Sequence, residues 1–200
     1  MQDRPTDFIF GLGKLKTIPR SGWISHGIGP QEVESVADHA FSTSGLAMFL
    51  ADMEGRHGRH VDVEKVLRMA LLHDLAEGLT FDISKSYLEY LGRRGEAIKR
   101  EVEEAAWNHI VESIRGKWMR MKYAELQSEF NAEETFESQI VHAADKLDIL
   151  FQVIAYHRKG YPRRILADLW TSTNRSLTGV RIPSVSNLRK TAVRLYKAAT

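Results

Sequence analysis

The sequence of 200 residues contains no cysteine, which excludes disulfide bonds and thiolate metal ligands. Any bound metal must therefore be held by histidine, carboxylate or backbone oxygen atoms. No apolar run approaches the roughly 18 residues of a membrane span, so no membrane partner is expected. Residues Met1–Pro5 lack a basic segment followed by an apolar core. No secretory signal is expected from them, and a cytoplasmic setting is favoured.

The chain also lacks a strong excess of charge of either sign. Its 28 Lys and Arg residues face 26 Asp and Glu residues, which gives a formal net charge of +2. The C-terminal third is mildly basic, but its charges are too dilute to predict a polymeric nucleic acid as the main partner. A hydrophobic fraction of 43% is ordinary for a globular protein. A chain of this length buries roughly 70% of its unfolded surface on folding, so it needs no disulfide bonds or other cross-links to fold.

Apolar residues recur with helical spacing between three segments rich in glycine or proline, at 11–30, 55–60 and 160–162, and no alternating strand is evident. The pattern predicts an all-α protein with one domain over 1–200, a core over about 15–160 and a C-terminal helix packed on it. A mixed segment over 79–90 is expected to contain a turn. Helices are predicted over about 31–54, 62–75, 96–115, 117–130, 133–159 and 187–199.

The sharpest local feature is the pair His73-Asp74, which ends an apolar helical segment. Burying an imidazole beside a carboxylate is costly unless both find partners. Adjacent helical residues point about 100° apart, so both side chains can reach one ion only beyond the helix end. A His-Asp dipeptide alone is a weak signal, because a capped helix end has the same appearance.

Two further polar residues interrupt apolar helices. Asp145 lies between Ile140 and Leu147, where an unpaired carboxylate would need a cation or a proton. His39 lies among small and apolar neighbours on the first long helix. Taken together, these anomalies predict a site for a divalent ion such as Mn²⁺, Fe²⁺, Co²⁺, Ni²⁺ or Zn²⁺. A six-coordinate ion held by four such ligands would keep open positions for water and a phosphate oxygen.

The order His, His-Asp, Asp on separate helices resembles the HD-domain superfamily. Flanking segments narrow the resemblance to its 5′-deoxynucleotidase branch, over about Leu15–Tyr156. These segments are Leu15–Trp23, Glu34–His39, and His73–Glu77 with Asp82 after it. Phe81 stands where the family commonly has glycine, and Ser21-Gly22 separate Arg20 from Trp23.

The resemblance implies a single HD domain that uses one divalent metal ion (Co, Mn, Ni, Fe, Zn or Mg). It implies that four residues are the metal ligands, namely His39, His73, Asp74 and Asp145.

Catalytic and substrate-binding roles follow from the same resemblance. Asp74 and Glu77 match catalytic positions, and Glu77, about one turn after the His-Asp pair, is suited to act as the general base. Arg20 matches the residue that binds phosphate, for which its planar fork is suited. Trp23 and Asp82 match positions beside the sugar and the leaving oxygen.

The expected function is a metal-dependent phosphoric monoester hydrolase that acts on nucleoside 5′-monophosphates, as a homodimer. Two other functions stay open. One is an HD-type phosphodiesterase or nucleoside-triphosphate hydrolase, for which His109 and His142 would help to hold a second metal. The other is a non-catalytic regulatory module that binds nucleotides.

Overall fold

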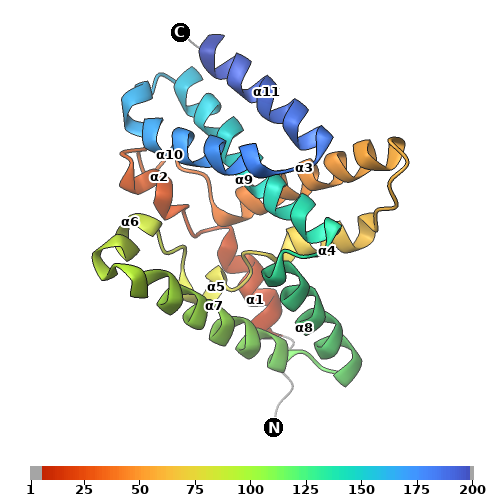
Figure 1. Ribbon diagram of the computed structural model, residues 1–200. Coiled ribbons are helices and arrows are strands. Elements are labelled where there is room, and N and C mark those ends of the chain that lie inside the picture. Colours follow the sequence, from red (N-terminus) through yellow and green to blue (C-terminus); the bar gives the residue numbers. More distant parts are fainter. Residues whose placement is uncertain (1–5, 199–200) are drawn as a thin grey trace. The chain divides into compact units, whose positions relative to one another are not determined.

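The computed structural model describes residues 6–198, and Figure 1 shows that this part of the chain is built of helices. Within these residues, the β-type pairing is a single isolated bridge between Pro19 and Ser35. The all-α class predicted from the sequence is therefore confirmed. The helices are α1 Thr6–Leu15, α2 Ser21–Ser25, α3 Val36–Arg56, α4 Val63–Leu72, α5 Glu77–Thr80, α6 Lys85–Leu88, α7 Arg93–Ser113, α8 Lys117–Ala132, α9 Phe136–Arg158, α10 Arg163–Ser176 and α11 Pro183–Ala198, with 3-10 turns at Glu89–Leu91 and Leu177–Gly179.

The first long helix, α3, begins at Val36, later than the predicted start near 31. The reason is a reciprocal cap. The Asp38 backbone N–H donates to Oγ of Ser35 at 3.1 Å, and the Ser35 backbone N–H donates to Oδ2 of Asp38 at 2.9 Å. This arrangement is a capping box, which satisfies N–H groups that a helix start otherwise leaves free. It also fixes the register of α3, and so the position of His39 one turn further on.

The periodicity predicted neither α1 nor α10, and it did not resolve the short helices α2, α5 and α6. Helix α1 overlaps the segment 11–30, which is rich in glycine and proline, and α10 begins directly after the segment 160–162. In α10 the signal was present, since Leu166, Trp170 and Thr173 are buried at the spacing of one helical face. The start of α4 agrees with the sequence, because Oδ1 of Asp62 accepts the backbone N–H of Lys65 at 3.0 Å as an N-cap.

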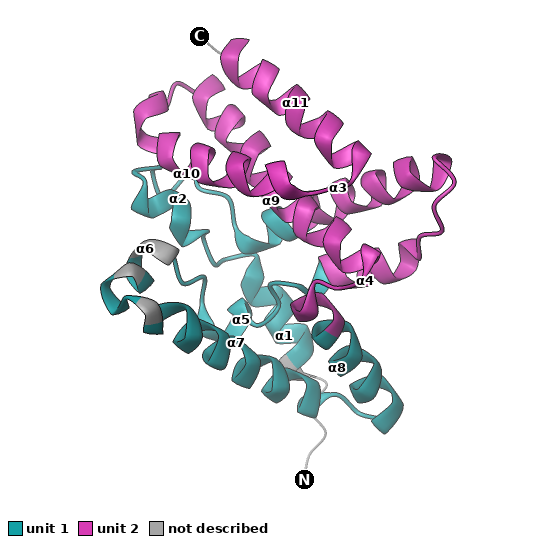
Figure 2. Cartoon of the chain, viewed as in Figure 1, with its two compact units in different colours: residues 1–40, 71–128 teal, residues 41–70, 129–200 magenta. Residues whose placement is uncertain are grey.

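The chain divides into two compact units, coloured separately in Figure 2. Unit 1 comprises residues 1–40 and 71–128, and unit 2 comprises residues 41–70 and 129–200. In unit 1, α1 and α5 pack on each other and on α7. The apolar cluster of this unit consists of Leu15, Ile18, Val36, Leu75, Ala76, Ala106, Trp107, Ile110 and Val111. Leu75 and Ala76 follow the His-Asp pair directly, so this core anchors the segment that carries it.

In unit 2, α9 packs against both α10 and α11. The middle of α9 is buried along its length, including Ile140, Leu147 and Val153. Trp170 of α10 also stacks on Tyr196 of α11, with ring centroids 3.8 Å apart. The C-terminal helix therefore packs on α9 and α10, and this packing stabilises it, as is usual for helices in proteins.

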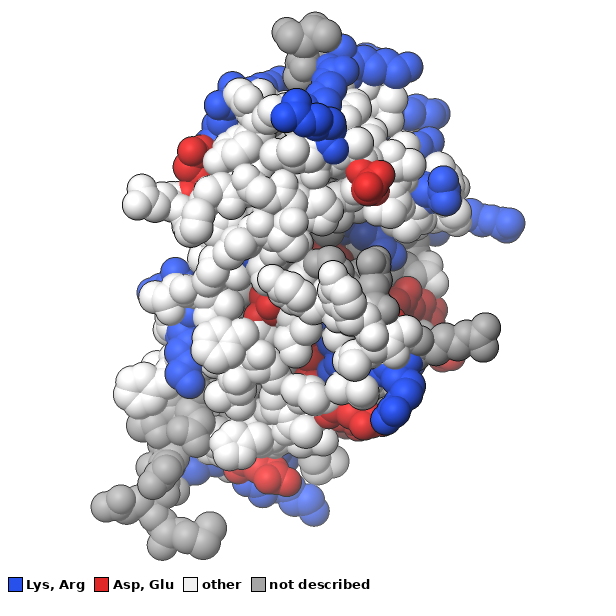
Figure 3. Space-filling view, turned by 90° about the vertical axis from the view of Figure 1, so that its left-hand side faces the viewer, with Lys and Arg blue, Asp and Glu red and all other residues white. Residues whose placement is uncertain are grey.

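The charged surface is mixed on the face that Figure 3 shows. Lys and Arg side chains are most frequent towards the top of that view, with Asp and Glu between them and large uncharged areas below. Within residues 6–198, no helix combines the length and the apolar character needed to cross a membrane.

Candidate active site

Three of the predicted metal ligands come from two places in unit 1. His39 is the fourth residue of α3 and is fully buried. His73 and Asp74 lie in the turn that follows α4, before α5 begins at Glu77. The sequence predicted that the His-Asp pair ends an apolar helix, and this placement is confirmed. Because the chain leaves the helix at this point, both side chains can turn towards His39.

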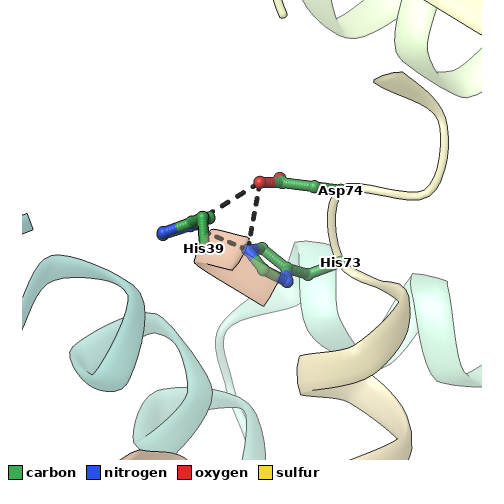
Figure 4. Close-up of side chains that lie close together, drawn as sticks. All are labelled: His39, His73 and Asp74. Carbon is green, nitrogen blue, oxygen red and sulfur yellow. Dashed lines mark hydrogen bonds and ion pairs between the residues drawn. The ribbon is translucent and has the colours of Figure 1, made fainter. Parts of the chain in front are cut away.

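The three side chains point towards one another, as Figure 4 shows. Nε2 of His39 and Nε2 of His73 are 3.4 Å apart. Oδ2 of Asp74 lies 3.2 Å from Nε2 of His73 and 3.6 Å from Nε2 of His39. Two imidazole nitrogens and one carboxylate oxygen therefore converge on one small volume that is largely removed from solvent.

This donor set fits a divalent ion. Two atoms that each lie about 2.1 Å from one ion are roughly 3.0–3.4 Å apart at octahedral or tetrahedral bond angles. The separations among His39, His73 and Asp74 are close to this range. The chemistry of the donors agrees, because imidazole with carboxylate and no sulfur suits first-row divalent ions.

Arg20 reaches the same place from the segment before α2. Its Nη1 donates to Oδ2 of Asp74 at 2.9 Å and lies 4.0 Å from Oε2 of Glu77. The backbone explains this position, because the Arg20 N–H donates to the carbonyl of Glu34 at 3.0 Å, next to the isolated bridge. The phosphate-binding residue expected from the sequence is thus held beside the His-Asp pair.

Glu77 is the first residue of α5, and only 4% of its surface is exposed. Its Oε2 is buried without a hydrogen-bond partner among the residues that the structure describes. The backbone of α5 can lie this deep because Gly78 has no side chain. A Cβ at Gly78 would lie 2.9 Å from the carbonyl oxygen of Gly11 in α1. The close approach of α5 to α1, next to the buried Glu77, therefore depends on glycine at position 78.

The pKa values of the two carboxyl groups shift in opposite directions. Burial by itself raises the pKa of Asp74, but the neighbouring His73 and Arg20 side chains lower it well below its usual range. Burial raises the pKa of Glu77 well above its usual range, and the negative charge of Asp74 raises it further. An acid-base residue and a permanently charged partner commonly have environments that separate their pKa values in this way.

Asp82 and Trp23 lie on the segments that flank Arg20 and Glu77. Oδ2 of Asp82 accepts the backbone N–H of Ser21 at 2.6 Å, which ties the start of α2 to the segment after α5. Trp23 is 3% exposed, and its Nε1 donates to Oε1 of Glu34 at 2.7 Å. Nothing in the sequence marked Glu34 as the partner of Trp23, since the two come together only through the loop before α3. The contact of Trp23 with a sugar stays a prediction.

Asp145 lies on α9 in unit 2, where it is half-buried among the fully buried Val141, Ala144 and Leu147. Its position inside an apolar helix is as expected, and its role as a ligand stays a prediction.

His109 and His142, the two histidines considered for a second metal, do not belong to the group formed by His39, His73 and Asp74. His109 is exposed on α7. His142 stacks on Phe130 with ring centroids 4.1 Å apart, and its Nε2 lies 2.8 Å from the Phe130 carbonyl oxygen. At that distance the nitrogen donates its N–H, so it offers no lone pair to an ion.

The family comparison agrees with the site. The profile of the HD domain family matches residues 12–182. The chain therefore belongs to the HD domain family.

A named relative indicates the branch of the HD domain family to which this chain is similar. The chain is 30% identical to the 5′-deoxynucleotidase HDDC2 of Dictyostelium discoideum over 155 residues, 76% of this chain and 77% of that protein. The expected resemblance to the 5′-deoxynucleotidase branch is thus confirmed.

Solved structures share the fold. A conserved hypothetical protein from Pyrococcus furiosus is 32% identical, with a TM-score of 0.76, over 96% of this chain and 98% of that one. An HD-domain phosphohydrolase from Listeria innocua has a TM-score of 0.77 over 92% of this chain and 84% of that one. At 24% identity, this second likeness concerns the fold.

Proposed function

We propose that this chain is a metal-dependent phosphohydrolase that releases phosphate from nucleoside 5′-monophosphates. The observation that carries the proposal is the convergence of His39, His73 and Asp74, with Arg20 on the carboxylate of Asp74. Relatives named 5′-deoxynucleotidase support the choice of substrate. Within this class, we propose a preference for deoxyribose over ribose.

His39, His73 and Asp74 would hold one divalent ion, with Asp145 as a fourth ligand. Once bound, such an ion supplies a Lewis acid for a phosphate oxygen and lowers the pKa of a bound water. The chain's own residues bind the phosphate and transfer the proton. Arg20 offers two parallel N–H donors to the phosphate oxygens, a geometry that a lysine cannot copy.

Glu77 accepts the proton of the attacking water. The water oxygen forms the new bond to phosphorus, the bond from phosphorus to the 5′ oxygen breaks, and the proton that Glu77 accepted passes to the departing 5′ oxygen. A buried carboxylate with a raised pKa is suited to this task, since its proton affinity is closer to neutral pH. Asp82, fixed by the Ser21 N–H, is proposed to lie near the sugar and the leaving oxygen, and Trp23 beside the sugar.

The proposal includes several finer points that follow from the resemblance. The ion is one of Co, Mn, Ni, Fe, Zn or Mg, one per chain. The two units act as a single domain, and the protein works in the cytoplasm as a homodimer on a small nucleotide. Metal analysis of the purified protein and light scattering test the ion count and the dimer.

The test of the activity is phosphate release from dAMP, dGMP, dCMP, dTMP and dUMP with Co²⁺ or Mn²⁺ added. We expect turnover that a chelator removes and that added metal restores, and faster turnover of dAMP than of AMP. A protein that binds these nucleotides yet releases no phosphate with any metal would be a regulatory module instead. Release of pyrophosphate or triphosphate from triphosphates alone would point to a different hydrolase.

A further inference from the structure

Helix α7 carries a polar pair on the face that otherwise packs into the core of unit 1. Lys99 and Glu103 are followed at helical spacing by Ala106 and Ile110, so the four lie along one side of α7. Ala106 and Ile110 belong to the apolar cluster that also contains Leu75, the residue after the His-Asp pair. The half-buried polar pair therefore continues the stripe of α7 that packs in unit 1, where α7 is in contact with α5.

The pair is close and partly buried. Nζ of Lys99 lies 3.4 Å from Oε1 of Glu103, and the Lys99 side chain is 19% exposed. Arg100, the next residue, is exposed. A lysine that folds inward loses side-chain entropy and hydration, so it needs negative charge nearby in compensation.

That negative charge comes partly from the proposed active site. Burial by itself lowers the pKa of Lys99, but Glu103 and then Glu77 and Asp82 raise it by more, so the net shift is upward. The relation is reciprocal, because the charge of Lys99 lowers the pKa of Glu77. Lys99 is thus a permanent cation in the field of the carboxylates on which the proposed reaction depends.

The proposed substrate makes this cation useful. A phosphate monoester carries a charge of about −1.5 to −2 near neutral pH. The proposed site already holds the carboxylates of Asp74, Glu77 and Asp82, all of which repel such an anion. Arg20 is in contact with Asp74. A second fixed cation would offset the remaining negative charge.

We propose that Lys99 is a positioning residue for the phosphate group. Its charge offsets that of Glu77 and Asp82 and lets the site accept a doubly charged phosphate. This inference rests on the proposed function for the identity of the substrate.

The test is the binding of inorganic phosphate to the Mn²⁺-loaded full chain, measured by titration calorimetry. Lys99→Met keeps the apolar stem and removes the charge, and we expect roughly 10-fold weaker phosphate binding. Lys99→Arg should restore affinity to within about 3-fold, because the charge returns. Glu103→Gln should leave phosphate binding equal or up to about 3-fold tighter, because it removes a negative charge from the same field.

The opposite signs separate this role from a structural one. If the pair only stabilises α7, Lys99→Met and Glu103→Gln weaken binding in parallel, and the proposal is wrong. Equal phosphate affinity in Lys99→Met and wild type also overturns it. Arg100→Met, an exposed neighbour on the same helix, is the matched control and should bind phosphate as wild type does.

Turnover of dTMP is measured on the same samples, so that the two proposals can fail separately. With Lys99→Met, we expect a raised KM and a smaller change in kcat, since binding of the anion is the step affected. Wild type that binds phosphate through Lys99 but hydrolyses no nucleotide would refute the proposed function and leave the role of Lys99 intact. Wild type that hydrolyses dTMP, with KM unaffected by Lys99→Met, would do the reverse.

Discussion

Arg20 donates from Nη1 to Oδ2 of Asp74 over 2.9 Å, so a cation expected to bind phosphate contacts a residue expected to bind metal. The same nitrogen lies 4.0 Å from Oε2 of Glu77. One guanidinium thus lies beside a proposed ligand and the proposed base. It reaches them from a segment fixed by backbone pairing to the residues just before α3.

This position predicts the behaviour of variants at Arg20. Arg20→Ala removes both the fork and the charge, and we expect kcat/KM for dAMP to fall by about 100-fold or more. Arg20→Lys should recover only part of the loss, because a lysine cannot make two parallel bonds to one phosphate. Lys16→Ala, at an exposed lysine close by in sequence, is the control and should match wild type. Full recovery by lysine would show that charge alone is needed.

Metal binding should depend on His39. Replacing a residue that merely orients a metal ligand commonly costs 10–100-fold in affinity, so loss of a direct ligand should cost more than roughly 100-fold. We therefore expect His39→Ala to show no binding of Mn²⁺ or Co²⁺ by calorimetry at concentrations that saturate wild type. His57→Ala, in the exposed loop after α3, should bind as wild type does. Unchanged affinity in His39→Ala would remove this histidine from the proposed ligand set.

Much of this site was predictable because charged and polar residues in apolar helical segments are rare unless they have a partner. A His-Asp pair at the end of an apolar helix needs partners, and that need is visible in the sequence. The loop carrying Arg20 was recognised by resemblance. The inward direction of Lys99 was not predictable, because a Lys-Glu pair at this spacing is also common on exposed helices. The depth of α5 depends on the approach of Gly78 to Gly11, a contact between distant segments that local patterns do not encode.

The raised pKa of Glu77 predicts that a neutral residue at this position makes the protein more stable but inactive. A buried carboxyl whose folded pKa exceeds its unfolded value makes the protein less stable as pH rises above the unfolded value of about 4.3. Glu77→Gln removes this penalty. In metal-free protein we expect the variant to be more stable than wild type by about 1 kcal/mol at pH 7, with the difference vanishing towards pH 4.

Chemical denaturation at several pH values, with a chelator present, measures this difference. The same variant should bind Mn²⁺ but release no phosphate. A difference in stability that does not change with pH would mean that Glu77 is not the group responsible.

Asp145 can be tested as the fourth metal ligand by replacing one oxygen of its carboxylate with an amide nitrogen. Asp145→Asn keeps the size of the side chain on α9 and removes its charge. We expect metal affinity to fall by more than roughly 10-fold, because an amide oxygen is a weaker ligand than a carboxylate for these ions. Asp168→Asn, at an exposed position of α10, is the matched control in the same unit. Affinity equal to that of wild type would exclude Asp145 from the site.

Phe81 holds a backbone conformation that favours glycine, with φ 60° and ψ 164°, and the residue is 67% exposed. A non-glycine residue there stores about 1–3 kcal/mol of strain. Phe81→Gly should therefore raise the free energy of unfolding by about 1 kcal/mol, after the entropy that glycine loses on folding is subtracted. Phe81→Ala keeps the Cβ and the strain, so it should bring no such gain.

Thermal melts of the three proteins in the presence of metal make the comparison. The strain precedes Asp82 directly, so its relief should also move that carboxylate relative to Ser21. We expect a changed ratio of dAMP to AMP turnover in Phe81→Gly. A stability gain shared equally by the alanine variant would trace the effect to the exposed ring, and not to the backbone.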